Sequence, residues 1–193
     1  VGPITGSSDH LRVELTSVGG HTARPHLTGD LVYALAKVVT DVPSVLSRRV
    51  DPRAGLSVVW GQIHAGGAAN VIPQSGHAEG TVRSLDALAW EHAPRVVTEA
   101  VEAVATPYDV NVRVDYTRGV PPVINDAESV FVVQQAARVM LGDHCVEAVE
   151  QSLGGEDFAW YLETVPGALF RLGVRTPGDA VMRDLHQGTF DAD

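Results

Sequence analysis

The segment VNVRVDYT, Val110–Thr117, alternates apolar and polar side chains without interruption. A period of two residues is typical of a β-strand with one buried and one solvated face. An apolar stripe with helical spacing precedes it and predicts an amphipathic helix; its members are Ala89, Ala93, Val96, Val97, Ala100, Val101 and Val104. This helix and strand are the end of a pattern that continues toward the N-terminus.

Two further strands and a long loop are predicted immediately upstream. Residues 77–85 (HAEGTVRSL) alternate again, which places His77, Glu79, Thr81 and Arg83 on one face. Residues 56–66 (LSVVWGQIHAG) also have the composition of a strand. Between the two strands, GGAANVIPQSG begins with a Gly-Gly pair and contains a proline, which is typical of a loop.

The first helix and strand of the pattern lie closer to the N-terminus. Apolar residues recur at helical spacing from Leu31 to Val42, with Asp30 as N-cap, and Pro43 is predicted to end this helix. Residues 11–18 alternate and predict the first strand. Residues 10–118 therefore read β-α-β-β-α-β, an α+β arrangement of the ferredoxin-like type with two helices on one face of an antiparallel sheet. The other sheet face must be solvated or covered by a partner.

A domain boundary is predicted at TRGVPPVIND, because a proline pair interrupts the pattern there. We expect residues 1–9 to be a linker from a catalytic domain and residues 119–193 to be an incomplete α/β segment of that domain. This last part carries a predicted helix near residues 127–141, then a short helix, an apolar strand (GALFRLGV) and a polar tail. It is too small to bury a core alone. The absence of an initiator methionine also suggests the middle of a longer protein.

Composition excludes several classes of function. The net charge is −10, and the 14 basic residues are scattered, so we expect no nucleic-acid partner. No run of about 18 apolar residues is present, so we expect no membrane span. The single cysteine, Cys145, permits no intramolecular disulfide, which suits a reducing compartment and a cytoplasmic location.

The residues alone do not assemble a complete catalytic site. The sequence has eight histidines but no H-E-x-x-H or C-x-x-C metal motif and no G-x-S-x-G elbow. Arg83 could hold a carboxylate bidentately or could be a solvated strand arginine. His186 has acidic neighbours that could tune a metal-binding imidazole, or it could be a surface histidine. In GGHTARPHLTGD, His21 and His26 could be metal ligands, a catalytic base with its partner, or loop histidines.

Five motifs in order and spacing resemble the M20 family of metal-dependent amidohydrolases and peptidases: GGHTARPHLTGD, GGAANVIPQSGHAEGTVRSLD, RGVPPVIND, LGGEDFAWYL and LHQGTFDAD. The branch they resemble most contains N-acyl-amino-acid amidohydrolases such as hippurate hydrolase. The resemblance implies an α/β catalytic domain with two metal ions, usually zinc, and an inserted ferredoxin-like lid that mediates dimerisation. By this resemblance, we expect the chain to contain the lid and the last part of the catalytic domain. We expect it to lack the family's N-terminal part, which supplies most metal ligands and the general base.

The resemblance also implies roles for single residues. His21 matches the lid histidine that reaches across a homodimer to polarise the scissile carbonyl, while His26 stays unassigned and is expected to be structural. Asn70 and Arg83 match lid positions that grip the substrate's carboxylate. Gly154 and Gly155 match a loop whose backbone lines the active site, and His186 matches the last metal ligand.

These roles lead to one preferred function and two alternative functions. We expect the C-terminal portion of a dizinc amidohydrolase that cleaves N-acyl amino acids and is inactive as this fragment alone. An M20-type dipeptidase or carboxypeptidase is the alternative within the family. A non-catalytic ferredoxin-like module for dimerisation or ligand sensing is the alternative from another class.

Overall fold

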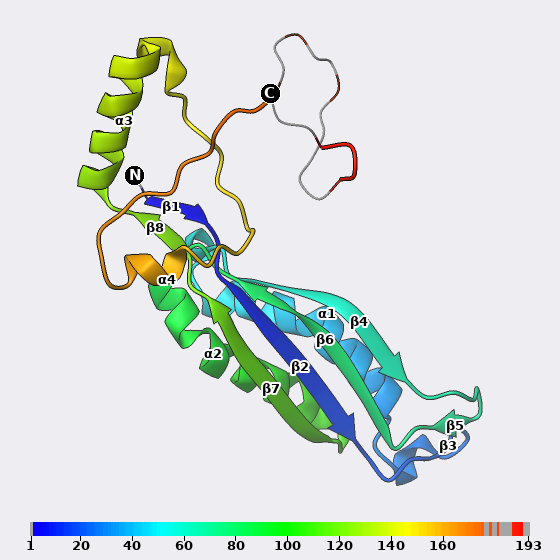
Figure 1. Cartoon of the computed structure of the whole chain (residues 1–193). Coiled ribbons are helices and arrows are strands. Elements are labelled where there is room, and N and C mark those ends of the chain that lie inside the picture. Colours follow the sequence, from blue (N-terminus) through cyan, green and yellow to red (C-terminus); the bar gives the residue numbers. More distant parts are fainter. Residues whose placement is uncertain (1, 176–177, 179–180, 182–186, 191–193) are drawn as a thin grey trace.

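A four-stranded antiparallel sheet with two helices on one face forms the larger part of the molecule (Figure 1). The computed structural model describes residues 2–175, 178, 181 and 187–190. The strands of the sheet are, in spatial order, β4 (Ser57–Ala65), β6 (Ser75–Arg83), β2 (Ser8–Thr16) and β7 (Asn111–Val120). The helices are α1 (Leu31–Arg49) and α2 (Ala87–Ala105).

The predicted β-α-β-β-α-β order is the order of elements found in the chain: β2, α1, β4, β6, α2 and β7. Each helix connects two strands that run in the same direction and are separated by one antiparallel strand. Strand β6 lies between β2 and β4, and β2 lies between β6 and β7. Both helices therefore cross on one face of the sheet, and no helix of the described residues covers the other face (Figure 1).

The core fills the space between the sheet and the two helices. Alternate residues of β2 are fully buried, as their period of two predicts, and the same is true of the inward face of β6. The buried side chains of the helices recur at helical spacing. The buried residues of this core are Leu11, Val13, Leu15, Leu31, Ala34, Leu35, Val38, Val42, Leu46, Val58, Ala78, Val82, Ala93, Val97, Ala100, Val101 and Ala105.

Helix α1 begins as predicted but ends later. Its N-cap is Asp30, whose side chain accepts a hydrogen bond from the N–H of Tyr33. The prediction that Pro43 ends the helix is wrong, since α1 continues to Arg49. A proline inside a helix removes one backbone hydrogen bond. The apolar stripe nevertheless continues past it, because Val42 and Leu46 are both buried against the sheet, and this tertiary packing offsets the lost bond.

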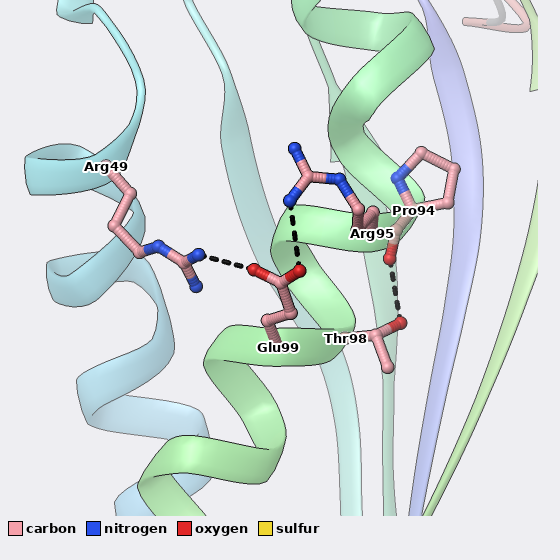
Figure 2. Close-up of polar contacts among 5 residues, drawn as sticks. All are labelled: Arg49, Pro94, Arg95, Thr98 and Glu99. Atoms are coloured by element: carbon pink, nitrogen blue, oxygen red, sulfur yellow. Dashed lines mark hydrogen bonds and ion pairs between the residues drawn. The ribbon is translucent and has the colours of Figure 1, made fainter.

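The two helices also contact each other through charged side chains at the surface (Figure 2). Glu99 on α2 accepts hydrogen bonds from Arg49 of α1 at 2.5 Å and from Arg95 of its own helix at 3.0 Å. Helix α2 contains Pro94, whose carbonyl accepts a 2.7 Å hydrogen bond from the Thr98 hydroxyl. The outer side of the helical layer is therefore polar at this point, opposite the apolar stripe that faces the sheet.

The remaining elements lie at one end of the sheet and surround a much smaller core. Strand β1 (Gly2–Thr5) pairs antiparallel with β8 (Val123–Asn125), and α3 (Ala127–Leu141) and α4 (Ala159–Leu162) follow. Helix α3 confirms the helix predicted at residues 127–141, but none of its residues is buried. The buried members of this second core are Ile4, Val123 and Ala159. This agrees with the expectation that the segment cannot bury a core alone.

The prediction of an apolar strand at GALFRLGV is wrong, since residues 167–174 form no helix or strand. A β-strand needs a neighbouring strand to pair its backbone N–H and C=O groups. The two-stranded sheet of β1 and β8 does not include this segment. The sequence pattern favoured a strand here, but no described strand pairs with it. The Gly167 carbonyl accepts instead from Asp126 N–H, and the Leu169 backbone bonds to the Asn125 side chain.

Several short elements complete the described chain. Strands β3 (Gly20–His21) and β5 (Val71–Ile72) form a small ladder at the far end of the large sheet. The part of the chain that the structure describes contains no helix with the length and apolar character needed to cross a membrane. The 3-10 helices are Pro25–Leu27, Pro52–Ala54, Thr106–Tyr108 and Asp143–Cys145.

Candidate functional site

The predicted histidine His21 lies at the free end of the large sheet, in a region that we call the tip (residues 17–28 and 66–74). The β3–β5 ladder pairs His21 with Val71, so the predicted residue Asn70 is adjacent to it. The N–H of Thr22 donates a 3.2 Å hydrogen bond to the carbonyl of Asn70. The predicted long loop at residues 66–76 thus contains a short strand, and this strand brings His21 and Asn70 together.

The imidazole of His21 is exposed, and one of its two nitrogen atoms is occupied. Its Nδ1 accepts a 3.0 Å hydrogen bond from the backbone N–H of Ala23. A neutral imidazole carries its proton on the other nitrogen when one nitrogen is an acceptor. The Nε2–H of His21 is therefore the group that can donate to a ligand, and a donor is what the stabilisation of a developing oxyanion requires.

Side-chain hydrogen bonds anchor the His21 loop to the end of the sheet. The hydroxyl of Ser17 donates to the carbonyl of Gly29 at 3.1 Å and lies 3.1 Å from the hydroxyl of Thr28. Gly19 has a φ of 68° and lies so close to Gln74 that a Cβ would be 2.9 Å from its Cγ. Glycine is therefore required at this turn. A hollow of about 300 Å³ is lined by Val18, Gly19, Gly20, His21, Asn70, Val71, Ile72, Pro73 and Gln74.

His26 also lies in the tip but has a different setting. It belongs to the 3-10 turn Pro25–Leu27 and is exposed. It does not line the hollow beside His21. The two histidines of GGHTARPH, which the sequence left undecided, therefore differ in geometry: only His21 borders a hollow together with Asn70.

Arg83 lies at the opposite end of the same sheet, in a region that we call the junction (residues 4–9, 83–86, 119–121 and 152–157). It is the last residue of β6, and its Nη1 donates a 2.5 Å hydrogen bond to the carbonyl of Leu153. The loop that contains Leu153 is tied to the N-terminal segment, since Gly6 N–H donates to Ser152 at 2.8 Å and Ser152 N–H donates to Ile4 at 3.0 Å. The guanidinium is thus fixed beside the predicted glycine loop.

Gly155 packs against the start of β2 at a distance that only glycine permits. A Cβ on Gly155 would lie 2.6 Å from the Cβ of Ser8 and 3.0 Å from Val120. Gly154 precedes it, and its N–H donates to the hydroxyl of Ser152 at 3.0 Å. The close approach brings the backbone of the Gly154–Gly155 loop to the side of Arg83, as a backbone-lined ligand site would need.

A hollow of about 520 Å³, which we call the Arg83 hollow, opens at the junction. Its lining residues are Ser8, Arg83, Gly119, Val120, Gly155, Glu156 and Asp157. A guanidinium can hold a carboxylate with two parallel hydrogen bonds, and Glu156 and Asp157 would disfavour an anion placed too near them. The hollow therefore suits an anionic group held close to Arg83.

Sequence reasoning did not identify Ser8 as a lining residue, because residues 1–9 were predicted to be a linker. Strand β2 in fact begins at Ser8. The signal was hidden by Asp9, a charged residue at an inward position of the alternation, which is only 2% exposed. A buried carboxylate breaks the apolar–polar pattern on which the strand prediction depends.

The five described candidate residues, of which Gly154 and Gly155 share one loop, form two separate groups. His21 and Asn70 lie at the tip, while Arg83 and Gly155 lie at the junction, at the other end of the sheet (Figure 1). The nine residues of β6 separate them, and a strand of this length spans roughly 26 Å. One small molecule cannot contact both groups of a single chain.

The described residues do not form a metal site. Among residues 2–175, 178, 181 and 187–190, no group of three or more histidine, cysteine, aspartate or glutamate side chains is placed to hold a metal ion. The predicted ligand His186 lies outside the described residues. A metal centre would therefore need ligands beyond this part of the chain.

Comparison with known sequences identifies relatives along the whole chain. The model of "Peptidase family M20/M25/M40" matches residues 13–192. A probable hydrolase of Synechocystis is 37% identical over the full chain, which covers 49% of that protein. An N-acetyldiaminopimelate deacetylase of Bacillus licheniformis is 32% identical over 91% of the chain, which covers 47% of that protein. The chain thus spans about half the length of these relatives.

One relative has a different name and a much greater length. A Rhodococcus jostii protein named as a glutamate–cysteine ligase is 49% identical over the whole chain, which covers only 24% of it. The name belongs to a protein about four times as long as the matched region. It therefore assigns no ligase activity to the residues shared with this chain.

Two solved structures have the same fold over most of this chain. A protein of methicillin-resistant Staphylococcus aureus described as an aminohydrolase superimposes with a TM-score of 0.87 at 25% identity, covering 99% of this chain and 49% of that one. A Bacillus subtilis protein described as a dinuclear metal-binding peptidase of the M20 family gives a TM-score of 0.68 at 28% identity, covering 86% of this chain and 40% of that one.

Proposed function

The chain belongs to peptidase family M20/M25/M40, a family of metal-dependent hydrolases, and on this premise we propose that it is the C-terminal portion of an amidohydrolase that cleaves N-acyl amino acids. The large sheet with α1 and α2, from Ser8 to Val120, is its ferredoxin-like lid. The residues before and after this sheet belong to the catalytic domain. The N-acetyldiaminopimelate deacetylases among the relatives support an N-acyl amino acid as the substrate class.

The observation that carries the proposal is the separation of the tip from the junction. His21 and Asn70 cannot meet a substrate held at Arg83 in the same chain, because the length of β6 lies between them. A second copy of the chain resolves this, since its tip can be inserted over the Arg83 hollow of the first. A homodimer with two shared active sites follows.

Each described residue then has a role at a stated atom. Arg83 holds the substrate's carboxylate in the hollow of its own subunit, and the Gly154–Gly155 backbone lines that hollow. From the other subunit, the Nε2–H of His21 donates to the carbonyl oxygen of the scissile amide as negative charge develops on it. Asn70, beside His21, helps to orient the substrate.

The metal ions are held mainly by residues that this chain does not contain. Two divalent ions, zinc in this proposal, would polarise the carbonyl and activate a water molecule, and His186 would be one of their ligands. The described residues hold no ion by themselves. They bind and orient the substrate, and the isolated 193-residue chain should be inactive. We place the enzyme in the cytoplasm, with small molecules as its substrates.

Mixed dimers of the full-length enzyme test the two-subunit site. One subunit carries His21→Ala and the other carries Arg83→Ala, and each homodimer has a defect in both of its sites. In a mixed dimer, one site has an intact Arg83 and an intact His21 from the partner, whereas the other site lacks both. Measured with substrate far below KM, where each homodimer is at least about tenfold less active, about half of the wild-type kcat/KM per dimer is therefore expected.

The activity of the mixed dimer distinguishes a site shared between two subunits from a site built within one chain. If His21 and Arg83 of the same chain served the same site, each site of the mixed dimer would have one defect. Activity would then stay at the level of the homodimers, and the proposal would be overturned. Analytical ultracentrifugation of the mixture, with one subunit labelled, confirms that mixed dimers have formed.

A metal measurement tests the division of labour between the chain and the rest of the enzyme. The purified 193 residues should bind zinc weakly and hydrolyse no N-acyl amino acid. The full-length enzyme should contain about two metal ions per subunit and lose activity on chelation. Tight stoichiometric zinc with turnover by the 193 residues alone would contradict the assignment.

A further inference from the structure

Asp9 is a buried carboxylate at the junction that the proposed function does not use. It is 2% exposed, and both of its oxygen atoms accept hydrogen bonds. Its Oδ1 accepts from the indole N–H of Trp90 at 3.0 Å and from the backbone N–H of Gly119 at 2.8 Å. Its Oδ2 accepts from the hydroxyl of Tyr116 at 2.6 Å. Three donors, one from α2 and two from β7, thus converge on one side chain.

The bond to Gly119 stabilises an irregularity in the sheet. The register between β2 and β7 shifts at this point, since Ser8 pairs with Val120 and His10 pairs with Thr117. Two residues of β7 therefore lie opposite Asp9 alone, which is the arrangement of a β-bulge. A bulge takes a backbone N–H out of the ladder, and the Asp9 carboxylate supplies the acceptor for it.

The bulge sets the wall of the Arg83 hollow. Gly119 lies so close to β2 that a Cβ there would be 1.9 Å from the carbonyl oxygen of Ser8. Directly after the bulge, Val120 and Ser8 form the surface against which Gly155 packs. Ser8, Gly119, Val120 and Gly155 all line the hollow. A displacement of the bulge would therefore move three of the backbone segments around Arg83.

The groups around Asp9 are held as hydrogen-bond donors. Burial, and then the hydrogen bond to Asp9, raise the pKa of the Tyr116 hydroxyl far above its ordinary value, so it remains a donor at any physiological pH. The guanidinium of Arg118 stacks on the Trp90 ring, 4.5 Å from its centroid. Arg118 thus packs on the ring whose N–H donates to Asp9 and helps to hold that ring in place.

We propose that Asp9 is a positioning residue for substrate binding: by holding the bulge at Arg118–Gly119, its carboxylate fixes Ser8, Val120 and Gly155 around Arg83. This rests on the proposed function, because it assumes that Arg83 receives the substrate's carboxylate. Asp9 touches no substrate atom. It acts through the shape of the Arg83 hollow.

Steady-state kinetics of the full-length enzyme test the proposal through a double-mutant cycle. Asp9→Ala should raise KM for an N-acetyl amino acid about tenfold with kcat changed little, since a lost bond to a charged acceptor corresponds to about that factor. The Asp9→Ala, Arg83→Ala double variant should have the KM of Arg83→Ala alone, because Asp9 acts only through Arg83. Multiplication of the two effects would overturn the proposal.

Two conservative variants distinguish positioning from general stability. Asp9→Asn keeps an oxygen for Gly119 and Trp90 and should stay within about threefold of the wild-type KM. Tyr116→Phe removes one bond to the same carboxylate without touching the bulge. It should lower the melting temperature but leave KM unchanged. The surface control Asp115→Asn should also leave KM unchanged. If Tyr116→Phe raised KM as much as Asp9→Ala, Asp9 would act only through stability and the proposal would fail.

Amide resonances of the 193-residue chain keep this test separate from the proposed function. Asp9→Ala should shift the signals of Gly119, Val120 and Gly155 and leave those of His21 and Val71 at the tip in place. An unshifted Gly155 would overturn the positioning role even if the enzyme were active. A wild-type full-length enzyme that cleaves no N-acyl amino acid would instead refute the proposed function, while the resonance shifts would still report on Asp9.

Discussion

The tip and the junction lie at opposite ends of one sheet and differ in how firmly they are held. At the tip, Val18 is 74% exposed and Leu27 66%, and a few loop hydrogen bonds hold His21 in place. At the junction, Ser7 and Ser84 are almost fully buried and bond to each other twice, with Ser7 N–H donating at 2.7 Å and the Ser7 hydroxyl accepting at 2.9 Å.

The difference indicates two kinds of functional surface. The junction is shaped within one chain, where glycines without room for a Cβ and the buried Asp9 leave little freedom. The tip presents a polar pair, His21 and Asn70, beside exposed apolar side chains, and so suits a surface completed by another molecule. A rigid binding hollow and an exposed donor fit an active site built from two subunits.

The largest expected effect is the loss of the donor at the tip. His21→Ala in the full-length enzyme should lower kcat by roughly 10²–10³, the scale for removing one oxyanion donor. KM should change less, because the interaction strengthens mainly in the transition state. His26→Ala is the matched control, since it changes an exposed tip histidine outside the hollow. An equal loss in both variants would show that the tip contributes only through its fold.

Glycine substitutions compare the rigidity of the two regions. Gly119→Ala should destabilise the chain by about 2 kcal/mol or more, seen as a fall of roughly 4–8 °C in Tm, because the new Cβ overlaps the carbonyl of Ser8. Gly67→Ala at the tip has no atom within 4 Å of the new Cβ and should leave Tm nearly unchanged. Similar melting curves for the two variants would remove the contrast between a rigid junction and an adaptable tip.

The binding role that we propose for the junction predicts an effect on KM. Arg83→Ala should raise KM about tenfold and change kcat little, since the carboxylate is held in both the ground and the transition state. Arg83→Lys should recover only part of this, because lysine lacks the planar fork. Arg113→Ala removes an exposed strand arginine that pairs with Asp115 and serves as the control. A fall in kcat with unchanged KM for Arg83→Ala would contradict a role in substrate binding.

The smallest expected effect concerns the helical layer that joins the two ends (Figure 2). Glu99→Gln breaks exposed ion pairs with Arg49 and Arg95 and should change Tm by less than about 2 °C. Hydrogen bonds from Arg49, then Arg95, lower the pKa of Glu99. A lowered pKa contributes stability above the ordinary glutamate pKa and loses it as the pH falls through the lowered value. The small difference in Tm should therefore begin to shrink below about pH 4 and disappear once the pH is below the lowered pKa.

Much of the fold was predictable because local patterns and tertiary packing agree. The alternation in Val110–Thr117 and the apolar stripe before it predicted β7 and α2, and the helix at residues 127–141 was placed with its bounds. The prediction failed at Pro43, where packing of Leu46 outweighed a local breaker, and at residues 167–174, where a strand-like pattern had no partner. Local propensity is a weak guide wherever a distant contact decides.

The sequence by itself determined the order of elements in the large sheet and its helices, the family and which side chains could do chemistry, because these are properties of residue type and spacing along the chain. Tertiary structure decided where those side chains meet. The pairing of β2 with β6 and β7, together with the packing of the glycine loop, brings Arg83, Gly155 and Ser8 into one hollow. The same structure places His21 and Asn70 at the other end of the sheet. It also shows that Asp9 accepts the hydrogen bond of a bulged backbone 110 residues away. Pairings between distant strands are fixed by packing and hydrogen bonding across the sheet, and no local pattern encodes them.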